Sequence, residues 1–199
     1  MRGEENRPPT GEITIFIAGA RRQLRIHVTG NAGAGKTTLA KHIAASLQLP
    51  VFFLDKVVWQ PGWQKTEPAQ RDMLEQELID KPDWVIDGVS HNIRYAADLT
   101  IFLDVPRHVC IGRCMRRNLP YMLRSRPELP ENCPELKILP QLLKIIWRFP
   151  DWVRPHILND IENGINVIRI RDGQELEGVD LRSCLFTSTQ IDLTGKPWS

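Results

Sequence analysis

The segment that most constrains this chain is a glycine-rich run of nine residues, from Gly30 to Thr38. It reads Gly-Asn-Ala-Gly-Ala-Gly-Lys-Thr-Thr and fits the pattern G-x-x-x-x-G-K-[ST] at every fixed position. The residues before it, Leu24–Thr29, are β-branched and alternate like a strand, and apolar residues recur at helical spacing over 39–47. A strand, this loop and a helix, in that order, are typical of a site that binds the phosphates of a nucleotide.

The residue types of this loop suit a polyphosphate. Several backbone N–H groups must point inward, and only a chain with few Cβ atoms wraps a phosphate that closely. The start of the following helix adds its partial positive charge. Lys36 is expected to reach the β- and γ-phosphates of ATP, and the Thr37 hydroxyl to ligate Mg²⁺. The alternative is a glycine-rich turn that only happens to precede a helix. The predicted nucleotide-binding residues are Gly30, Asn31, Ala32, Gly33, Ala34, Gly35, Lys36, Thr37 and Thr38.

Apolar runs that read as buried strands alternate with helical segments along the chain. The predicted strands are 24–29, 50–55, 84–88, 99–103 and 165–170, and the predicted helices after the loop helix are 66–80, one that starts at Pro106, 135–148 and 151–162. Such alternation predicts an α/β fold with a doubly wound, five-stranded parallel sheet. We expect one domain over 1–199 with its core at about 24–172. A disordered segment is expected at 1–12, and a tail without clear pattern at 175–199.

Several local features depart from this plain alternation. A strand is also predicted at Ile13–Ala18, either as an added edge strand or as residues ahead of a later start codon. The stretch Val57–Gln64 is too aromatic for an ordinary solvent loop, and the proline-rich segment 118–135 is expected to be a loop. In the helix 66–80, three apolar side chains are expected to face inward: Met73, Leu74 and Leu78.

Length and charge narrow the function classes. The chain has 199 residues and a formal charge of +2, so charge balance argues against direct DNA binding. Its four cysteines have neither C-x-x-C spacing nor a ligand-like histidine pattern, and reduced cysteines fit a cytoplasmic protein. No apolar run approaches membrane-spanning length. We therefore expect a cytoplasmic protein without a membrane partner.

Two predicted strands end in a carboxylate, at the sheet edge where open α/β sheets bind ligands. We interpret Asp87 as a carboxylate that orients Mg²⁺ or positions the phosphoryl acceptor, and the alternative is a capping residue. Asp55 is either a base or hydrogen-bond acceptor for that acceptor group, or a buried turn residue. Trp59 and Trp63 follow it and suit the wall of an acceptor pocket.

These motifs and their order resemble the P-loop nucleoside monophosphate kinases, and within that group the adenylate-kinase-like proteins called DNA topology modulation proteins. The resemblance covers about 24–172 and implies strand order 2-3-1-4-5, a central ATP site, an acceptor region and an arginine-bearing helical lid. The chain departs from the pattern in its N-terminal extension and after about 175. The matching segments are Gly30–Thr38, Phe53–Asp55 with Trp59 and Pro61–Trp63, Trp84–Gly88, Ala97–Pro106, and the pair Arg113 and Arg117.

Arg113 and Arg117 match the lid arginines of that kinase group and lie four residues apart on one predicted helix. Planar guanidinium groups neutralise the charge that spreads over a transferring phosphate, and the alternative is a solvated basic helix face. The predicted catalytic residues are Lys36, Asp87, Arg113 and Arg117, with Thr37 and Asp87 at the metal. The predicted acceptor-binding residues are Asp55, Trp59 and Arg94.

Two functions remain open at this point. The first is an ATP-dependent phosphotransferase that acts on a nucleoside monophosphate or another small acceptor. The second is a nucleotide-switched or DNA-associated regulator in which ATP binding matters more than transfer. The carboxylates and the lid arginines favour the first, because a DNA binder should show a broader basic surface.

Overall fold

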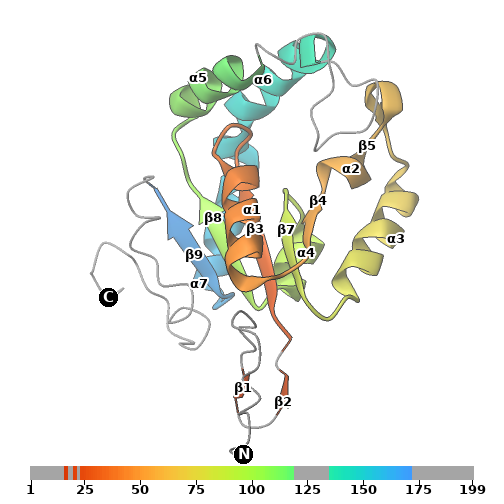
Figure 1. The fold of residues 1–199 in the computed structure, drawn as a ribbon. Helices are drawn as coiled ribbons and strands as arrows, with labels where there is room; N and C mark the ends of the chain where they lie inside the picture. Colours follow the sequence, from red (N-terminus) through yellow and green to blue (C-terminus); the bar gives the residue numbers. More distant parts are fainter. Residues whose placement is uncertain (1–15, 18–19, 22, 119–134, 172–199) are drawn as a thin grey trace, which may run out of the picture.

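The computed structural model describes residues 16–17, 20–21, 23–118 and 135–171. At its centre is a sheet of five parallel strands, in the order β4-β7-β3-β8-β9. The strands are β3 (Arg25–Gly30), β4 (Val51–Phe53), β7 (Trp84–Asp87), β8 (Leu99–Leu103) and β9 (Val167–Ile170). The α/β fold and the strand order 2-3-1-4-5 are therefore confirmed, and the strand that leads into Gly30 is the central one (Figure 1).

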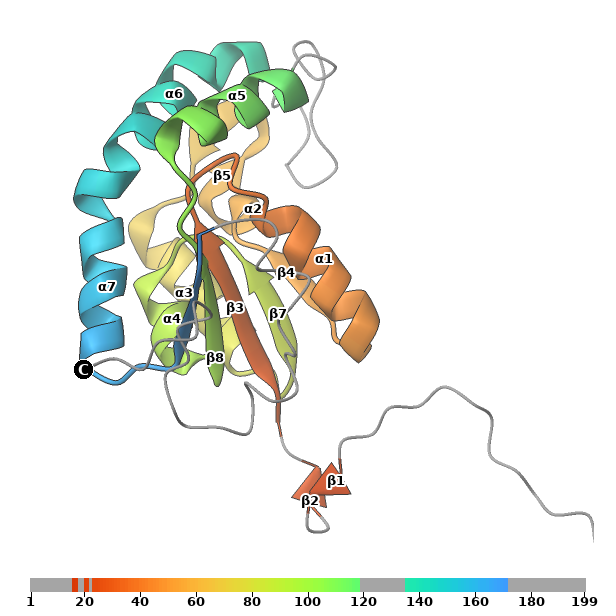
Figure 2. The same ribbon diagram turned by 90° about the vertical axis from the view of Figure 1, so that its left-hand side faces the viewer.

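Helices cover both faces of this sheet (Figure 2). One face carries α1 (Lys36–Leu47). The other face carries α3 (Pro68–Ile79), α4 (His91–Ala96) and α7 (Arg154–Glu162). At the carboxyl end of the strands lie α5 (Arg107–Asn118) and α6 (Glu135–Trp152), above the loop that follows β3.

The core explains why these strands read as unbroken apolar runs. Because helices pack on both faces, the side chains of β7 and β8 are buried on both sides. Full burial of one such side chain stabilises the fold by about 1.5–3 kcal/mol. The α1 side holds Ile26, Val28, Ile43 and Ile101; the α6–α7 side holds Phe102, Phe149, Ile157 and Val167; a third cluster holds Leu54, Trp84, Ile86 and Ile93.

The N-terminal strand prediction is corrected by the structure. β1 (Phe16–Ile17) pairs with β2 (Ala20–Arg21) in a separate antiparallel ladder and does not extend the five-stranded sheet. The predicted disordered segment 1–12, most of the predicted loop 118–135 and the tail 175–199 lie outside the described residues.

The aromatic stretch after β4 is a compact set of short elements. They are α2 (Asp55–Val58), β5 (Trp59–Gln60), the 3₁₀ turn η1 (Pro61–Trp63) and β6 (Gln64–Lys65). β5 and β6 pair as an antiparallel hairpin, so the segment is ordered, as the aromatic content suggested.

Two helix predictions are partly wrong. Met73 is 67% exposed rather than inward, because the inward stripe of α3 passes through Arg71, Glu75 and Leu78 instead. The predicted break at about 149–150 is also absent, since α6 continues through Pro150 to Trp152.

The buried histidine of the central strand gives the fold a pH dependence. His27 lies in β3 with no exposed surface, and its Nε2 lies 3.1 Å from the Gly88 carbonyl oxygen. Burial lowers the pKa of His27 from 6.5 to about 3, the Gly88 hydrogen bond opposes this shift, and the charges of Arg94 and Lys36 add to it. The unfolded chain therefore takes up a proton near pH 6.5 that the folded chain does not take up until about pH 3.

We expect the free energy of unfolding to fall as pH drops below about 6.5, by at most about 1.4 kcal/mol per pH unit from this one residue. Urea unfolding at pH 7.5 and pH 5 measures the effect above the range in which most carboxylates titrate. His27→Gln should lose this part of the pH dependence, whereas the exposed His42 on α1 is the control and His42→Gln should keep it. Equal pH dependence in wild type and His27→Gln would contradict the assignment.

Candidate active site

The loop after β3 brings the start of α1 to the carboxyl edge of the sheet. Gly33 has φ 82°, and a Cβ there would lie 2.3 Å from the carbonyl oxygen of Cys110 in α5. Gly35 is the N-cap of α1 with φ 105°, and no side chain of the described residues caps this helix. Both positions therefore require glycine, and the open helix start offers N–H groups and partial positive charge to an anion.

Asn31 is buried and holds this loop in shape. Its Oδ1 accepts a hydrogen bond from the Ala32 N–H at 2.8 Å, and its carbonyl oxygen accepts one from the Lys36 Nζ at 3.0 Å. Its Nδ2 donates to the carbonyl oxygen of Ile146 in α6 at 2.9 Å. The usual intrahelical donor to that carbonyl, the N–H four residues later, is missing because residue 150 is proline. The loop is thus preformed and tied to α6.

The two predicted metal ligands lie together. The Thr37 hydroxyl at the start of α1 donates to Asp87 Oδ2 at 2.6 Å, and Asp87 is only 7% exposed at the end of β7. β7 and β3 are neighbouring parallel strands, which is why two residues fifty positions apart meet. A hydroxyl and a carboxylate are hard oxygen ligands, so this pair fits Mg²⁺.

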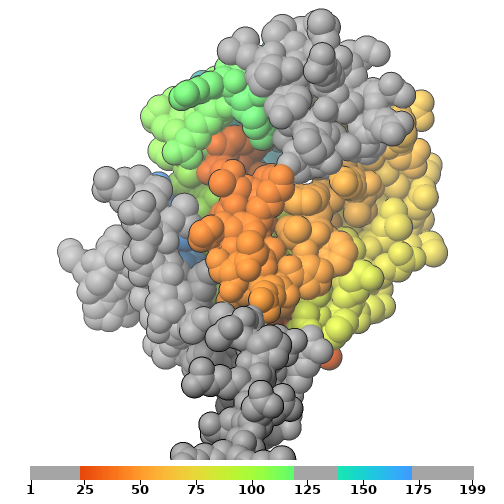
Figure 3. Space-filling model, viewed as in Figure 1, coloured from red at the N-terminus to blue at the C-terminus, as the bar shows by residue number. Residues whose placement is uncertain are grey.

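A cavity of about 310 Å³ lies beside the loop. Figure 3 shows the face that α1 covers, with the described atoms of the loop and α1 in orange between those of α5 in green and of the α2–α3 region. The cavity brings together eight of the predicted residues: Gly30, Ala32, Lys36, Thr37, Asp55, Trp59, Asp87 and Arg117. The remaining loop residues, with Arg94 and Arg113, do not line it.

Much of the lining of this cavity is aromatic or apolar. Trp59 and Trp63 contact edge to face with ring centroids 5.3 Å apart. α6 also contributes Leu142, Ile145 and Phe149 to the lining. Asp55 is exposed at the start of α2, so the reading of this residue as a buried turn residue is wrong.

Arg71 is a cavity residue that the sequence reasoning missed. Its Nε donates to Glu75 Oε1 at 3.0 Å, one turn along α3. Glu75 is only 1% exposed, and its Oε2 also accepts a hydrogen bond from the Ser90 hydroxyl at 2.7 Å. A buried carboxylate therefore orients this guanidinium. The sequence did contain one signal for this contact. Glu75 is a polar residue on the inward stripe of the predicted helix, four positions after Arg71.

Arg94 does not line the cavity that holds Asp55 and Trp59, the other two predicted acceptor residues. It is 3% exposed, and its Nε lies 2.5 Å from Asp160 Oδ2 in α7. Tyr95 also donates to Asp160, at 2.8 Å, so this cluster joins α4 to α7. The buried guanidinium of Arg94 is thus paired with a buried carboxylate, and this pair has a structural role.

The two lid arginines occupy different places on α5. Arg117 lines the cavity, and its Nε donates to Asn118 Oδ1 at 3.2 Å. Arg113 is exposed and donates to the carbonyl oxygen of Ala34 in the loop at 3.3 Å. Arg113 therefore contacts the phosphate loop directly, whereas Arg117 shares the cavity with the loop residues Lys36 and Thr37.

The parallel sheet, the glycine loop and the Thr37–Asp87 pair define an α/β domain of the P-loop class. No protein-family model matches the chain, and no curated protein matches it. In the part of the chain that the structure describes, no helix is both long and apolar enough to cross a membrane.

Solved structures with a similar fold include several kinases. A gluconokinase from Sinorhizobium meliloti is 16% identical, with 83% of this chain and 91% of that chain covered and a TM-score of 0.45. A shikimate kinase from Acinetobacter baumannii, in complex with shikimate, is 20% identical over 81% and 96%, with a TM-score of 0.45. A shikimate kinase from Aquifex aeolicus is 17% identical over 81% and 94%, also at 0.45. At this level of similarity the likeness assigns no activity to this chain.

Proposed function

We propose that this chain is an ATP-dependent phosphotransferase that moves the γ-phosphate of ATP to a nucleoside monophosphate or another small acceptor. One observation carries the proposal: the same cavity is lined by Lys36, Thr37 and Asp87 and by the predicted acceptor residues Asp55 and Trp59. Phosphoryl transfer needs little more than such positioning and charge stabilisation. The resemblance to nucleoside monophosphate kinases, and within them to the DNA topology modulation proteins, remains a prediction from the motifs.

The phosphate side would hold ATP and Mg²⁺. Lys36 exchanges its hydrogen bond to the Asn31 carbonyl for the phosphates, and Thr37 and Asp87 supply oxygen ligands to the metal. When bound, Mg²⁺ neutralises charge on the β- and γ-phosphates. Arg117 lies in the same cavity, and its planar guanidinium suits the charge that spreads over the phosphoryl oxygens.

The acceptor side would bind and shield the group that receives the phosphate. Asp55 accepts the proton of the acceptor hydroxyl, or a hydrogen bond from it, while Trp59 and Trp63 form one wall. The apolar residues of α6 that also line the cavity exclude water, which otherwise competes as an acceptor. The buried, reduced thiols of Cys110 and Cys114 agree with the proposed cytoplasmic location.

The test is ADP formation from ATP and Mg²⁺ with a panel of nucleoside monophosphates and small polyols, with the phosphorylated product identified by mass spectrometry. We expect slow basal hydrolysis and fast ADP formation with at least one acceptor. Hydrolysis that responds to duplex DNA and to no small acceptor would contradict the proposal and favour a regulator.

We further predict that Arg71 recognises an anionic group on the acceptor. Arg71→Ala should raise the KM for the acceptor about tenfold while the affinity for ATP stays unchanged, because one charge-assisted contact is lost. Steady-state kinetics with the acceptor from the panel measure this split. Arg116 on α5 is exposed and lines no part of the cavity, so Arg116→Ala is the control. A loss of ATP affinity in Arg71→Ala as large as the rise in the KM for the acceptor would contradict the prediction.

A further inference from the structure

A second cavity, of about 630 Å³, opens at the carboxyl ends of β8 and β9. It shares no lining residue with the candidate active site. Among the described residues, its lining includes one carboxylate, that of Asp104, and four guanidinium groups, those of Arg107, Arg154, Arg169 and Arg171. These arginines come from α5, α7, β9 and the residue that follows β9, so the fold gathers them from distant parts of the chain.

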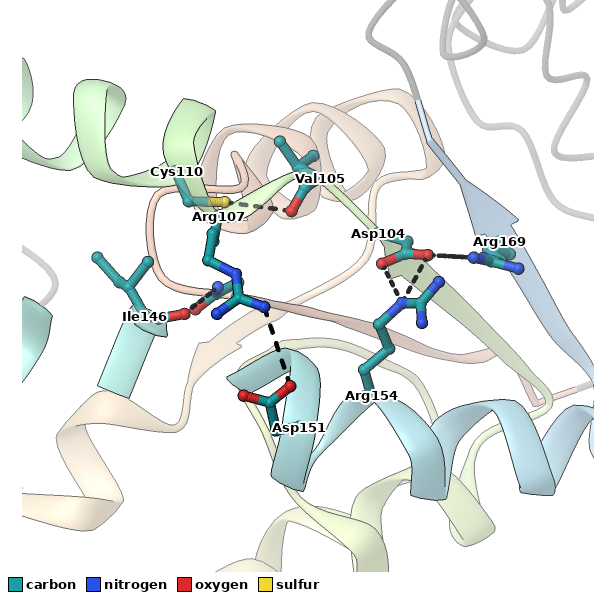
Figure 4. Close-up of polar contacts among 9 residues, drawn as sticks. Asp104, Val105, Arg107, Cys110, Ile146, Asp151, Arg154 and Arg169 are labelled. Atoms are coloured by element: carbon teal, nitrogen blue, oxygen red, sulfur yellow. Dashed lines mark hydrogen bonds and ion pairs between the residues drawn. The ribbon is translucent and has the colours of Figure 1, made fainter. Parts of the chain in front are cut away.

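Asp104 lies between two of the arginines (Figure 4). Arg154 donates from Nε to Oδ1 at 2.9 Å and to Oδ2 at 3.1 Å, and Arg169 donates from Nε at 2.8 Å and from Nη2 to Oδ2. Burial raises the pKa of Asp104, but these hydrogen bonds and charges outweigh it and lower the pKa below its ordinary value. One ionised carboxylate thus faces two cations, and positive charge remains in excess.

Arg107 adds charge that is held in place without being neutralised. Its Nη1 donates to the Trp147 carbonyl oxygen at 3.3 Å, and its guanidinium lies 4.7 Å from the ring centroid of the same residue. In the described part of the chain, Arg107 pairs with Asp151, whose side chain is 63% exposed, at an N–O distance of 3.9 Å (Figure 4). Water and salt screen an ion pair of that length and exposure, so Asp151 compensates the positive charge of Arg107 only weakly.

Two helix starts strengthen the positive potential of the cavity. α5 begins at Arg107 and α7 begins at Arg154, so the partial positive charge of each helix lies beside these side chains. Within the described part of the chain, Arg154 contacts Asp104 through Nε, which leaves the Nη groups of its fork for a further acceptor.

We propose that this arginine cavity is a second anion site, separate from the phosphate loop, for a small oxyanion with at least two negative charges. Guanidinium forks match phosphate and carboxylate oxygens equally in geometry, so the ligand is either a phosphate group or a polycarboxylate. The proposal does not depend on the proposed kinase activity.

The test measures anion binding while the phosphate loop is occupied. Protein saturated with ADP and Mg²⁺ is dialysed against labelled orthophosphate, and in a second series against labelled citrate. We expect one bound orthophosphate or citrate per chain, and about tenfold weaker binding in Arg107→Gln, since a charged donor is lost. The arm that shows binding tells whether the ligand is a phosphate or a polycarboxylate. Added salt should weaken the binding of this anion strongly.

Arg148→Gln is the matched control. Arg148 is exposed on α6, stacks 4.6 Å from the ring centroid of Trp152 and does not line the cavity. The variant should bind the anion like wild type. Thermal unfolding checks that Arg107→Gln is folded, and Arg107→Lys, which keeps the charge but not the fork, should lose less than Arg107→Gln. If ADP-saturated wild type binds neither anion at millimolar concentration, or if both glutamine variants lose equally, the arginines form only a structural tie and the proposal is overturned.

Discussion

Replacing Lys36 with alanine is expected to lower ATP turnover about a hundredfold while the protein stays folded. In the described part of the chain, the ammonium donates to the Asn31 carbonyl oxygen at 3.0 Å, and the loop shape rests instead on glycine backbone angles and on the Asn31 side chain. Removal of a charge aimed at the transferring phosphate costs about 3 kcal/mol of transition-state stabilisation, which is about a factor of 100 in rate.

Turnover is measured as acceptor-dependent ADP formation, with circular dichroism and thermal unfolding to show that the variant is folded. Lys41→Ala is the control, because Lys41 is exposed on the same helix with its Nζ 5.6 Å from the ring centroid of Phe53. It should turn ATP over like wild type. A Lys36→Ala protein that keeps the wild-type rate would show that the loop does not bind the transferring phosphate.

The phosphate loop and the sheet could be predicted because their signals are local. The glycines, the lysine and the flanking strand and helix lie within one short stretch, and parallel strands bring their carboxyl ends to one edge by rule. This rule also explains why Thr37 and Asp87 could be paired in advance, and the structure brings them to 2.6 Å.

The role of Arg94 could not be predicted because its partner is distant in sequence. The arginine lies on a short helix after an Asp-Gly strand end, a position that favours a ligand contact. Its carboxylate partner, Asp160, is 66 residues later on α7. A sequence pattern does not show such a pair, since either residue alone reads as exposed and polar.

Arg71 was missed for a related reason. The helix 66–80 was read by its apolar residues, which placed Met73 inward, whereas a buried Glu75 occupies the inward stripe. Burial of a carboxylate is costly unless it is hydrogen-bonded, and Arg71 with Ser90 satisfies that need. The continuation of α6 past Pro150 was also hidden, because the Asn31 amide that satisfies the freed carbonyl lies 115 residues away.

Replacing Asp55 with asparagine is expected to lower phosphoryl transfer about a thousandfold while the affinity for ATP stays unchanged. Asp55 lines the cavity from the start of α2, on the acceptor side, while the loop residues that would bind ATP lie on α1 and after β3. Asparagine keeps the size of the side chain and removes the carboxylate that accepts a proton. Only the acceptor hydroxyl loses its partner, so the substitution should lower the rate of phosphoryl transfer and not the affinity for ATP.

Three measurements on wild type and Asp55→Asn separate the steps: ATP affinity, basal hydrolysis and acceptor-stimulated ADP formation. Asp72→Asn is the control, because Asp72 is an exposed carboxylate on α3 that does not line the cavity. It should match wild type in all three. A loss of ATP affinity in Asp55→Asn would instead assign this carboxylate to the nucleotide side.

The same substitution distinguishes the kinase from a nucleotide-switched regulator. A regulator has no acceptor hydroxyl to activate, so Asp55→Asn would be nearly silent in it, and duplex DNA would change the rate of ATP hydrolysis in both proteins alike. In a kinase, the closed cavity keeps water from the γ-phosphate until the acceptor binds, so basal hydrolysis is slow and the carboxylate matters only when the acceptor is present. A large loss confined to the acceptor-stimulated rate therefore supports transfer, because no other role of Asp55 would spare both ATP binding and basal hydrolysis.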